Sequence, residues 1–453
     1  MSTVSPEDQE RIDAIEQALL KRWPETRIAP TLERIAALVD VLGSPQLSYP
    51  TIHIGGTNGK TTTSRMIDSL LFEMGLRTGR FTSPHLESYL ERISINGHPI
   101  DPKALIFSYN DIAAYLDFID SKFDNPISFF EAITALAFAA FAEHPIDVGV
   151  IEVGMGGEWD ATNVVDADVS VIMPIALDHM EYLGSTLGEI AKTKAGIIKE
   201  SGYVVLAQQE PEAAVELLKK AADMGADVAR EGVEYEVESR SVAVGGQLLT
   251  IRTPKDRYED IFLPLHGKHQ ASNAAAALVA VEAFFGDQEL DYEAVLEGFA
   301  QVKSPGRCEV LHRDPTVIID AAHNPHGAKA LADTIESEFT FDEIIGVFAA
   351  MADKDVEGAL IELEKVMNQI IVTCNSSTRS MSVSDVEAIA TRVFGADRVF
   401  TADSLPIAIE KALKDSVRPL SDETIGILIS GSVVTAGEAR TIVRRHFSKE
   451  AQA

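Results

Sequence analysis

Cysteine, positive charge and long apolar runs are all scarce in this chain, and each shortage excludes a class of protein. Only Cys308 and Cys374 occur in 453 residues, so neither a disulfide framework nor a cysteine-rich metal site is predicted. Lys and Arg number 39 against 70 Asp and Glu, a formal net charge of −31, which argues against nonspecific binding to nucleic acid or to a membrane surface. No apolar run is long enough to span a bilayer, and residues 1–10 are polar and acidic, unlike a secretory signal. These features fit a protein of the reducing cytoplasm.

The length predicts more than one domain, because 453 residues exceed the size of an ordinary single domain. The stretch Ser304-Pro-Gly306 interrupts both helical and strand periodicity. We therefore expect one domain at 1–302 and a smaller one at 303–453. Apolar strand-like runs alternate with helical patterns in both, which is typical of the α/β class. In the second domain the expected strands are 316–320, 344–349, 370–374, 397–401 and 424–430, and a Gly-x-Gly-x-x-Gly dinucleotide fingerprint is missing.

Several local patterns predict helices, caps and surfaces. Two amphipathic helices are expected within residues 1–48, and a β-rich excursion within 233–265. Ser128 is expected to cap a strongly apolar helix, with Glu131 three residues later completing a capping box. Asn273 is expected to cap an Ala-rich helix. A solvated cationic face is the default expectation for three lysines: Lys192, Lys194 and Lys199.

The segment that organises the chain is a glycine turn between a strand-like run and a helix-compatible run. The run 49–54 is apolar and β-leaning, the turn reads Gly56-Thr57-Asn58-Gly59-Lys60-Thr61, and residues 64–74 favour a helix. Such a turn lets backbone N–H groups approach phosphates, while the lysine reaches the outer phosphates and a Thr hydroxyl can face Mg²⁺. Ile54 replaces the first glycine of the common P-loop spacing. The segment predicts a P-loop nucleotide-binding domain with a central, mostly parallel sheet.

Three further polar residues follow apolar strand-like runs. Ser83 and Glu152 stand at the ends of two such runs, and His179 follows a third. Because ligands of parallel α/β sheets bind beyond the carboxyl ends of the strands, we expect these residues to converge on the glycine turn. A carboxylate is costly to bury unless it is paired or metal-bound. The set therefore predicts a magnesium site, although histidine is an uncommon ligand for that cation.

Taken together, the motifs of this chain resemble the Mur ligase superfamily, and within it the folylpolyglutamate synthases and dihydrofolate synthases. The matching segments appear in the family's order over roughly residues 30 to 437 and are highly specific as a set. They are Gly56–Thr61, Thr82–Leu86, Glu152–Gly157, Asp160–Asn163, Asp178–His179 with Leu183–Gly184, Lys194–Lys199, Pro305–Arg307, Asp320–Pro325, Asp353–Asp355 and Ser430–Ser432.

The resemblance implies a role for each matching residue. It implies that Gly56 to Thr61 hold ATP phosphates, that two Mg²⁺ ions are bound, and that Lys194 is carbamylated. The same resemblance implies that Lys60, Lys194 and His323 are catalytic. It also implies a smaller Rossmann-like α/β domain at the C-terminus and a monomer. The remaining implied contacts are Ser83, Glu152 and His179 to metal, Asn273, Arg307 and Asp320 to nucleotide, His323 near the γ-phosphate, and Phe130, Asp160 and Ala161 in a pterin pocket.

The implied reaction is ATP-dependent formation of an amide between L-glutamate and a folate or pteroate carboxylate, through an acyl phosphate. The expected partners are small molecules only: ATP, L-glutamate, and dihydropteroate or a reduced folate. A cell-wall amino-acid ligase is an alternative within the superfamily, since Thr61 and Thr62 follow Lys60 as in those enzymes. A nucleotide-dependent switch or a small-molecule kinase would use the same loop. Stimulation of ATP consumption by glutamate separates a ligase from both.

Overall fold

The computed structural model describes residues 5–24, 29–416 and 424–450, which form two compact units. Unit 1 consists of Met1–Arg240, Leu248–Leu263 and Ala271–Val302. Unit 2 consists of Ser241–Gln247, Pro264–Gln270 and Lys303–Ala453. Two short segments from the expected domain 1–302 thus cluster with the second unit. Within the described ranges no helix is both long enough and apolar enough to cross a membrane.

Unit 1 is built on an eight-stranded sheet with the order β4-β3-β2-β5-β1-β6-β7-β8. The strands from β2 to β8 in this order are parallel, and β3 and β4 extend the sheet in antiparallel fashion. This arrangement confirms the predicted mostly parallel sheet. The bounds are β1 Thr51–Gly55, β2 Thr78–Phe81, β3 Ile93–Ile95, β4 His98–Pro99, β5 Val148–Glu152, β6 Val169–Ile172, β7 Tyr203–Leu206 and β8 Asp227–Arg230.

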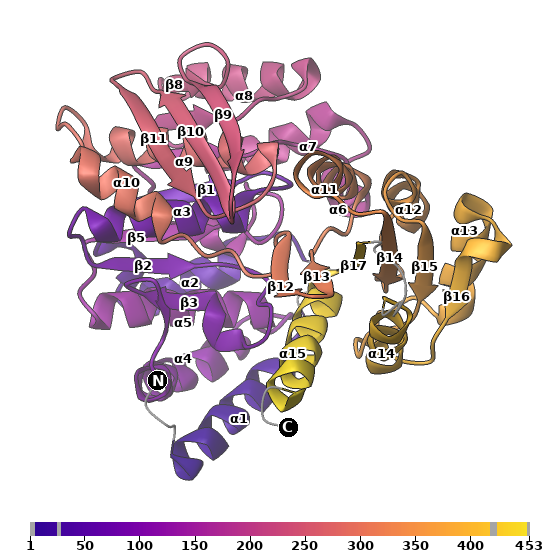
Figure 1. The fold of residues 1–453 in the computed structure, drawn as a ribbon. Coiled ribbons are helices and arrows are strands. Elements are labelled where there is room, and N and C mark those ends of the chain that lie inside the picture. The colour runs from indigo at the N-terminus through magenta and orange to yellow at the C-terminus, as the bar shows by residue number, and fades with distance from the viewer. Residues whose placement is uncertain (1–4, 25–28, 417–423, 451–453) are drawn as a thin grey trace. The chain divides into compact units, whose positions relative to one another are not determined.

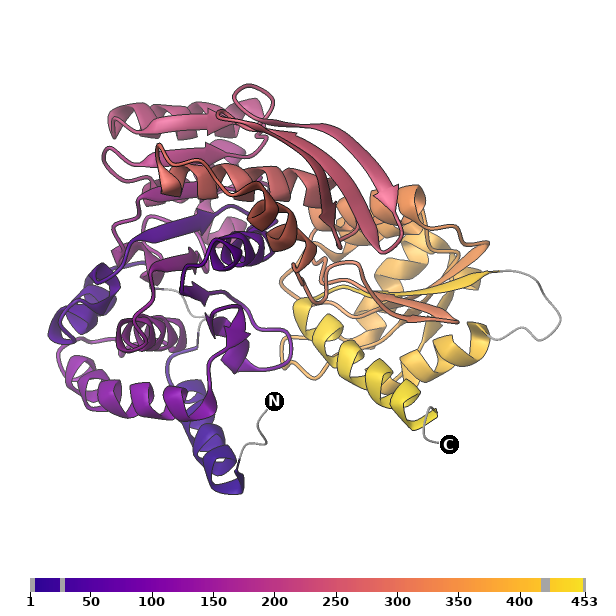
Figure 2. The ribbon, with the colours of Figure 1, turned by 60° about the vertical axis from the view of Figure 1, so that its left-hand side comes forward.

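Helices cover this sheet, and α1, α2, α4 and α5 pack together at one end of unit 1, whereas α8 lies at the other end (Figures 1 and 2). Helix α5 is almost wholly apolar and buried, as expected for a helix enclosed on all sides. The predicted capping box of Ser128 and Glu131 begins it. The helices are α1 Pro6–Leu20, α2 Glu33–Val41, α3 Lys60–Glu73, α4 Pro102–Asp120, α5 Phe129–Glu143, α6 Met180–Leu183, α7 Leu187–Lys194, α8 Pro211–Asp223, α9 Lys268–Phe285 and α10 Tyr292–Ala300.

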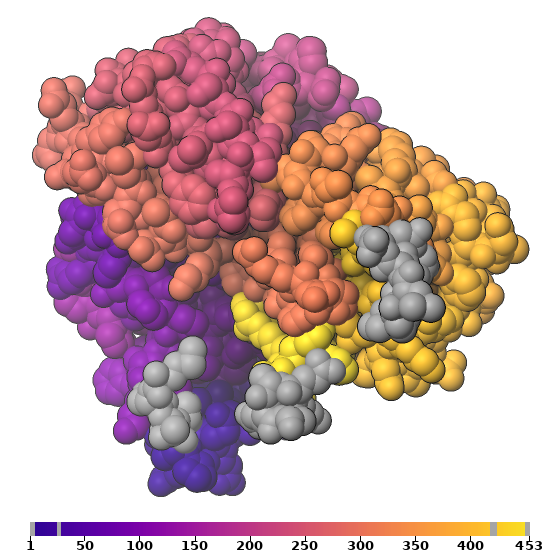
Figure 3. Space-filling view, viewed as in Figure 1, coloured from indigo at the N-terminus to yellow at the C-terminus, as the bar shows by residue number. Residues whose placement is uncertain are grey.

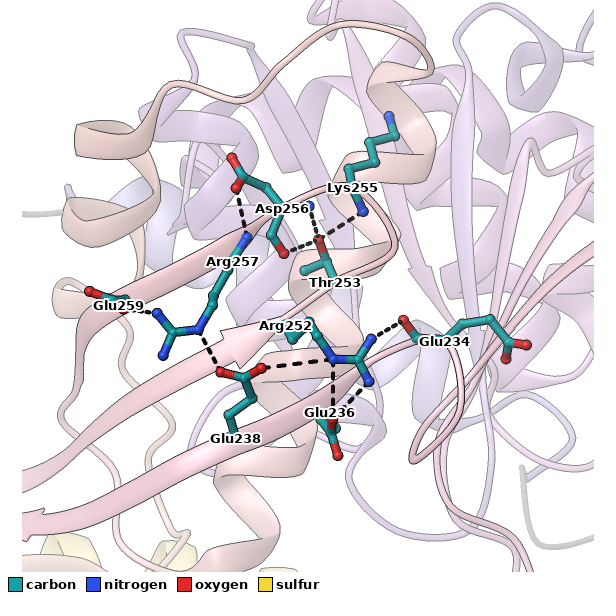
Figure 4. A network of polar contacts seen from close by, with 9 residues as sticks. All are labelled: Glu234, Glu236, Glu238, Arg252, Thr253, Lys255, Asp256, Arg257 and Glu259. Atoms are coloured by element: carbon teal, nitrogen blue, oxygen red, sulfur yellow. Dashed lines mark hydrogen bonds and ion pairs between the residues drawn. The ribbon is translucent and has the colours of Figure 1, made fainter.

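The predicted β-rich excursion forms a separate three-stranded sheet in the order β11-β10-β9. Its strands are β9 Glu236–Ala243, β10 Gly246–Arg252 and β11 Arg257–Leu263. They contribute a continuous part of the surface seen in Figure 3. Charged side chains on these strands and their turns form the network of ion pairs in Figure 4. Toward the interior, Tyr258 and Thr253 donate to the buried carboxylate of Glu282 on α9, over 3.0 and 2.8 Å.

Unit 2 contains a six-stranded sheet in the order β12-β13-β17-β14-β15-β16, with an apolar core cluster on each face. All five expected strands are present and parallel, whereas β12, which pairs antiparallel with β13, was not predicted. Its partly exposed residues lack the apolar run that marked the others. The elements are β12 Glu309–Arg313, β13 Thr316–Ile319, β14 Glu343–Phe348, β15 Gln369–Val372, β16 Val399–Thr401, β17 Ile425–Ser430, α11 Pro325–Glu338, α12 Val356–Glu364, α13 Val383–Phe394, α14 Leu405–Ser416 and α15 Val433–Glu450.

Candidate active site

Four neighbouring strands of unit 1 direct their following loops to one edge of the sheet. In the order β2-β5-β1-β6, Ser83 follows β2, Glu152 is the last residue of β5, the glycine turn follows β1, and His179 follows β6 at a greater distance. Ile54 on β1 pairs with Glu152 on β5, so the glycine turn and this carboxylate leave the sheet side by side. The topology therefore places the four predicted features around the carboxyl end of β1, as expected for a ligand site in a parallel sheet.

The glycine turn has a backbone path that only glycine tolerates. Gly56 and Gly59 adopt φ values of 126° and 90°. A Cβ atom on Gly56 would lie 2.7 Å from the carbonyl oxygen of Met173. Lys60 begins α3, and its Nζ donates to the carbonyl oxygens of Gly56 and Thr57, each over 3.1 Å. The turn therefore presents a positive side chain and a helix N-terminus at one place, which favours bound phosphate.

Asn273 lies against this turn, and the prediction that it caps a helix is wrong. Helix α9 begins at Lys268, so Asn273 lies within the helix and not at its start. Its Oδ1 would be 2.7 Å from a Cβ atom on Gly59. The amide is almost completely buried, at 4% exposure. The helix thus delivers a polar side chain to the glycine turn from a distant part of the sequence.

Glu152 connects the turn to the loop that follows β2. Its Oε1 accepts a hydrogen bond from the hydroxyl of Thr61 over 2.8 Å, and its Oε2 accepts from the backbone N–H of Ser83 over 3.3 Å. The carboxylate is 1% exposed. A buried anion that contacts a loop hydroxyl beside a lysine is the kind of oxygen donor that hard cations prefer.

His179 is held differently from Ser83 and Glu152. Strand β6 ends at Ile172, so His179 lies seven residues beyond it, at the start of the short helix α6. Its φ is 50°, and its ring nitrogen Nε2 lies 3.9 Å from the carboxylate of Asp178. The side chain is 40% exposed. In the described part of the chain, no three His, Cys, Asp or Glu side chains group as a metal site would require.

Lys194 is buried, so the expectation that it belongs to a solvated cationic face is wrong. The residue is 4% exposed, and its Nζ donates to the carbonyl oxygen of Gly56 over 2.9 Å. Burial, together with the nearby charge of Lys60, lowers the pKa of Lys194 to about 7. Lys199 is also drawn inward, where it donates to the carbonyl of Asn163, and only Lys192 is exposed. The amine of Lys194 is therefore partly neutral near neutral pH.

A glycine-rich loop after β5 brings together the residues matched to the pterin pocket. A Cβ atom on Gly154 would be 2.4 Å from the ring of Phe130, so the loop can rest on this ring only because the residue is glycine. The loop then reaches Asp160, whose carboxylate accepts from the backbone N–H of Met155 over 2.8 Å. Ala161 follows, 6% exposed. Phe130, Asp160 and Ala161 thus border one loop.

Unit 2 contributes three predicted residues: Arg307 precedes β12, and Asp320 and His323 follow β13. The carboxylate of Asp320 accepts from the backbone N–H groups of Cys308 and Ala322, each over 2.7 Å. Burial raises the pKa of Asp320, and the adjacent charge of Arg307 opposes that rise. His323 hydrogen-bonds through Nδ1 to the carbonyl of Ala321 over 2.9 Å. The three predicted nucleotide residues of this unit therefore share one corner of it.

Two buried residues beside the site escaped the sequence analysis. His53 lies in β1 and Thr162 follows Asp160, and both are 0% exposed. A histidine within an apolar strand was a visible signal, but its partner is 109 residues away, so the sequence did not show what it contacts.

Comparison with known proteins agrees with this architecture. Residues 54–281 match the Mur ligase middle domain, and residues 306–433 match the Mur ligase glutamate ligase domain. A dihydrofolate synthase/folylpolyglutamate synthase of Mycobacterium tuberculosis is 48% identical, over 97% of this chain and 96% of its own length. A solved M. tuberculosis folylpolyglutamate synthase complexed with ADP superposes with a TM-score of 0.92 and 49% identity, covering 96% of this chain and 99% of that one. E. coli FolC in complex with DHPP and ADP reaches a TM-score of 0.85 at 29% identity, covering 98% and 100%.

These matches extend over both units and over nearly the full length of the relatives. The chain therefore belongs to the dihydrofolate synthase/folylpolyglutamate synthase family of the Mur ligase superfamily, and it is an ATP-dependent ligase.

Proposed function

We propose that this enzyme joins L-glutamate to the carboxylate of dihydropteroate, of a reduced folate, or of both, at the expense of ATP. The family and its named relatives support the reaction class. The observation that carries the proposal is the buried Glu152 carboxylate, which is hydrogen-bonded to Thr61 of the glycine turn. It brings a metal-type ligand to the loop that would hold the phosphates of ATP.

The nucleotide residues are assigned to both units. Gly56 to Thr61 bind the phosphates through backbone N–H groups, and Lys60 neutralises the outer ones. The close approach of Asn273 to Gly59 supports a nucleotide contact for that amide. From unit 2, three residues supply further contacts: Arg307 to phosphate, Asp320 to ribose and His323 to the γ-phosphate.

Two Mg²⁺ ions are assigned to the edge where these strands end. Ser83 and Glu152 offer a hydroxyl and a carboxylate, which fit a hard cation, and His179 would complete the set after its exposed side chain turns inward. Bound there, the metal supplies charge neutralisation for the phosphates.

Lys194 is assigned as a carbamylated lysine. Its Nζ lies near the glycine turn, and its pKa of about 7 leaves a neutral amine available. The lone pair of that nitrogen attacks the carbon of CO₂, and the nitrogen then loses one proton, which leaves a carbamate anion. This conversion would replace a buried, partly protonated amine with an anion beside the glycine turn, which could help to hold a metal.

The chemistry proceeds in two balanced steps. An oxygen of the acceptor carboxylate attacks the γ-phosphorus of ATP, and the bond from that phosphorus to the bridging β-phosphate oxygen breaks. The products of this step are ADP and an acyl phosphate. The neutral amine of glutamate then attacks the acyl carbon, phosphate departs, and the nitrogen loses a proton. Phe130, Asp160 and Ala161 hold the pterin end of the acceptor during both steps. Positioning and charge neutralisation supply most of the acceleration in phosphoryl transfer.

A direct assay tests this proposal. The purified chain is incubated with ATP, Mg²⁺ and L-glutamate, with dihydropteroate or tetrahydrofolate supplied separately, and the products are identified by mass spectrometry. We expect a glutamylated product that depends on all components, and the choice of acceptor defines the activity. Phosphate release without a glutamylated product from either acceptor would contradict the proposal.

A further inference from the structure

We propose that His53 and Thr162 form a buried hydrogen-bonded pair that positions Asp160 for the pterin group of the acceptor. This inference rests on the proposed function, because it assigns residues that act through Asp160. Both residues are fully buried and act through Asp160, so they are positioning residues and not catalytic ones.

The three side chains form a continuous chain of short contacts. Nε2 of His53 lies 2.9 Å from Oγ1 of Thr162, which in turn lies 2.5 Å from Oδ1 of Asp160. The backbone N–H of Thr162 donates to the same Oδ1 over 3.0 Å. Both His53 and Thr162 are fully buried, and Asp160 is 4% exposed. Because these groups are buried away from water, each side chain depends on its neighbour in the chain for its hydrogen bond.

The direction of each hydrogen bond follows from the available protons. Asp160 accepts backbone N–H groups on both oxygens, from Thr162 and from Met155. Burial raises the pKa of Asp160, and the donors at Met155, Thr162 and Gly154 oppose that rise. Because these donors point at both oxygens, the geometry favours the ionised carboxylate, which only accepts. The single hydroxyl proton of Thr162 is therefore given to Asp160, and its oxygen must accept from Nε2–H of His53.

His53 is consequently a neutral donor with a fixed tautomer. Its Nδ1 is buried and has no hydrogen-bond partner among the described residues. Burial, aided by the charge of Lys199, lowers the pKa of His53 to about 3. A neutral ring with Nε2–H suits the hydrogen-bond directions deduced above. The unpaired Nδ1 lowers the stability of the fold, and an apolar side chain of the same shape would avoid this loss. The hydrogen bond that Nε2–H donates to Thr162 explains why a histidine is nevertheless present.

The hydrogen bonds from His53 through Thr162 to Asp160 connect the proposed acceptor loop with the proposed phosphate turn. His53 lies on β1, three residues before Gly56 of the phosphate turn. Asp160 ends the glycine-rich loop that rests on Phe130. The hydrogen bonds thus tie the acceptor loop to the strand that carries the phosphate turn. Because the acceptor carboxylate must be positioned against the γ-phosphorus with a tolerance of about 0.5 Å, such a tie matters for rate as well as for binding.

The test removes one hydroxyl while keeping its shape. Thr162→Val should raise the KM for the pterin acceptor by roughly tenfold or more, since a hydrogen bond to a charged group is lost, while the KM values for ATP and glutamate stay within about twofold. Thr162→Ser keeps the hydroxyl and should restore the acceptor KM. A matched control is Thr78→Val, because the hydroxyl of Thr78 is buried yet has no hydrogen-bond partner among the described residues.

The outcomes separate this inference from the proposed function. If the wild-type protein glutamylates neither acceptor, the proposed function fails and the inference falls with it. If the wild type is active but Thr162→Val keeps a normal acceptor KM, or raises all three KM values equally, only the inference is overturned. Should Thr162→Val fail to fold, His53→Leu and His53→Gln test the same contact. The former should raise the acceptor KM, and the latter, which still carries an N–H donor, should not; equal values for the two would overturn the inference.

Discussion

Two arginine–glutamate pairs in unit 1 show how differently the same chemistry acts in two surroundings. Arg34 contacts Glu131 over 3.0 Å with side-chain exposures of 9% and 5%. Arg252 contacts Glu236 over 2.7 Å, yet these side chains are 36% and 46% exposed. The shorter contact is thus the one that is more exposed to solvent. Distance therefore says little about importance here, because solvent screens the exposed pair and leaves the buried one nearly unscreened.

The wider networks around the two pairs sharpen this contrast. Arg252 belongs to the charged surface of Figure 4, where Arg257 and Glu238 add further ion pairs. Glu131, by contrast, also accepts from the backbone N–H of Ser128 and so fixes the first turn of α5, which carries Phe130. The buried pair can thus set the position of Phe130, which we propose to contact the substrate, whereas the ion pairs of the surface network are exposed to solvent.

The largest effect is expected at Lys194, a buried lysine with an exposed counterpart on the same helix. Lys194→Ala should lower ligase activity by about a hundredfold or more, because a preorganised charge at the phosphates is lost. Lys192→Ala, on the exposed side of α7, is the control and should leave activity unchanged. Labelling with carbon-13 bicarbonate should give a carbamate NMR signal that is absent from Lys194→Ala. Full activity in that variant would refute the assigned role.

The next largest effect is expected at Arg34. Arg34→Ala leaves the Glu131 carboxylate buried without its partner, so the free energy of unfolding should fall by about 3–5 kcal/mol. Urea denaturation followed by circular dichroism measures this change. Replacing both members with apolar residues should recover much of the loss. A change below about 1 kcal/mol would mean that water reaches this pair.

The smallest effect is expected at Arg252. Arg252→Ala should change the free energy of unfolding by less than about 1 kcal/mol, since exposed ion pairs contribute little. The same denaturation assay at low and high salt checks this. The difference in unfolding free energy between the wild type and Arg252→Ala should shrink as the salt concentration rises. A loss as large as that of Arg34→Ala would erase the distinction between the two pairs.

The sequence revealed what is local and missed what depends on burial. The turn at Gly56, the carboxylate at the end of β5 and the capping box at Ser128 each follow from neighbouring residues, and the structure contains all three. The burial of Lys194 and the close approach of Asn273 to Gly59 depend on contacts across more than a hundred residues. Composition cannot distinguish a solvated lysine from one enclosed by a distant loop. The strand β12 was missed because an edge strand needs no apolar alternation.

The hydrogen bond between Thr61 and Glu152 joins residues 91 positions apart, and this spacing has a consequence for how the enzyme comes into being. A partly folded chain that has formed only β1 and its glycine turn holds no carboxylate beside the hydroxyl of Thr61. The hydrogen bond forms only once β5 lies between β2 and β1, so the glycine turn and its carboxylate partner are completed together during folding.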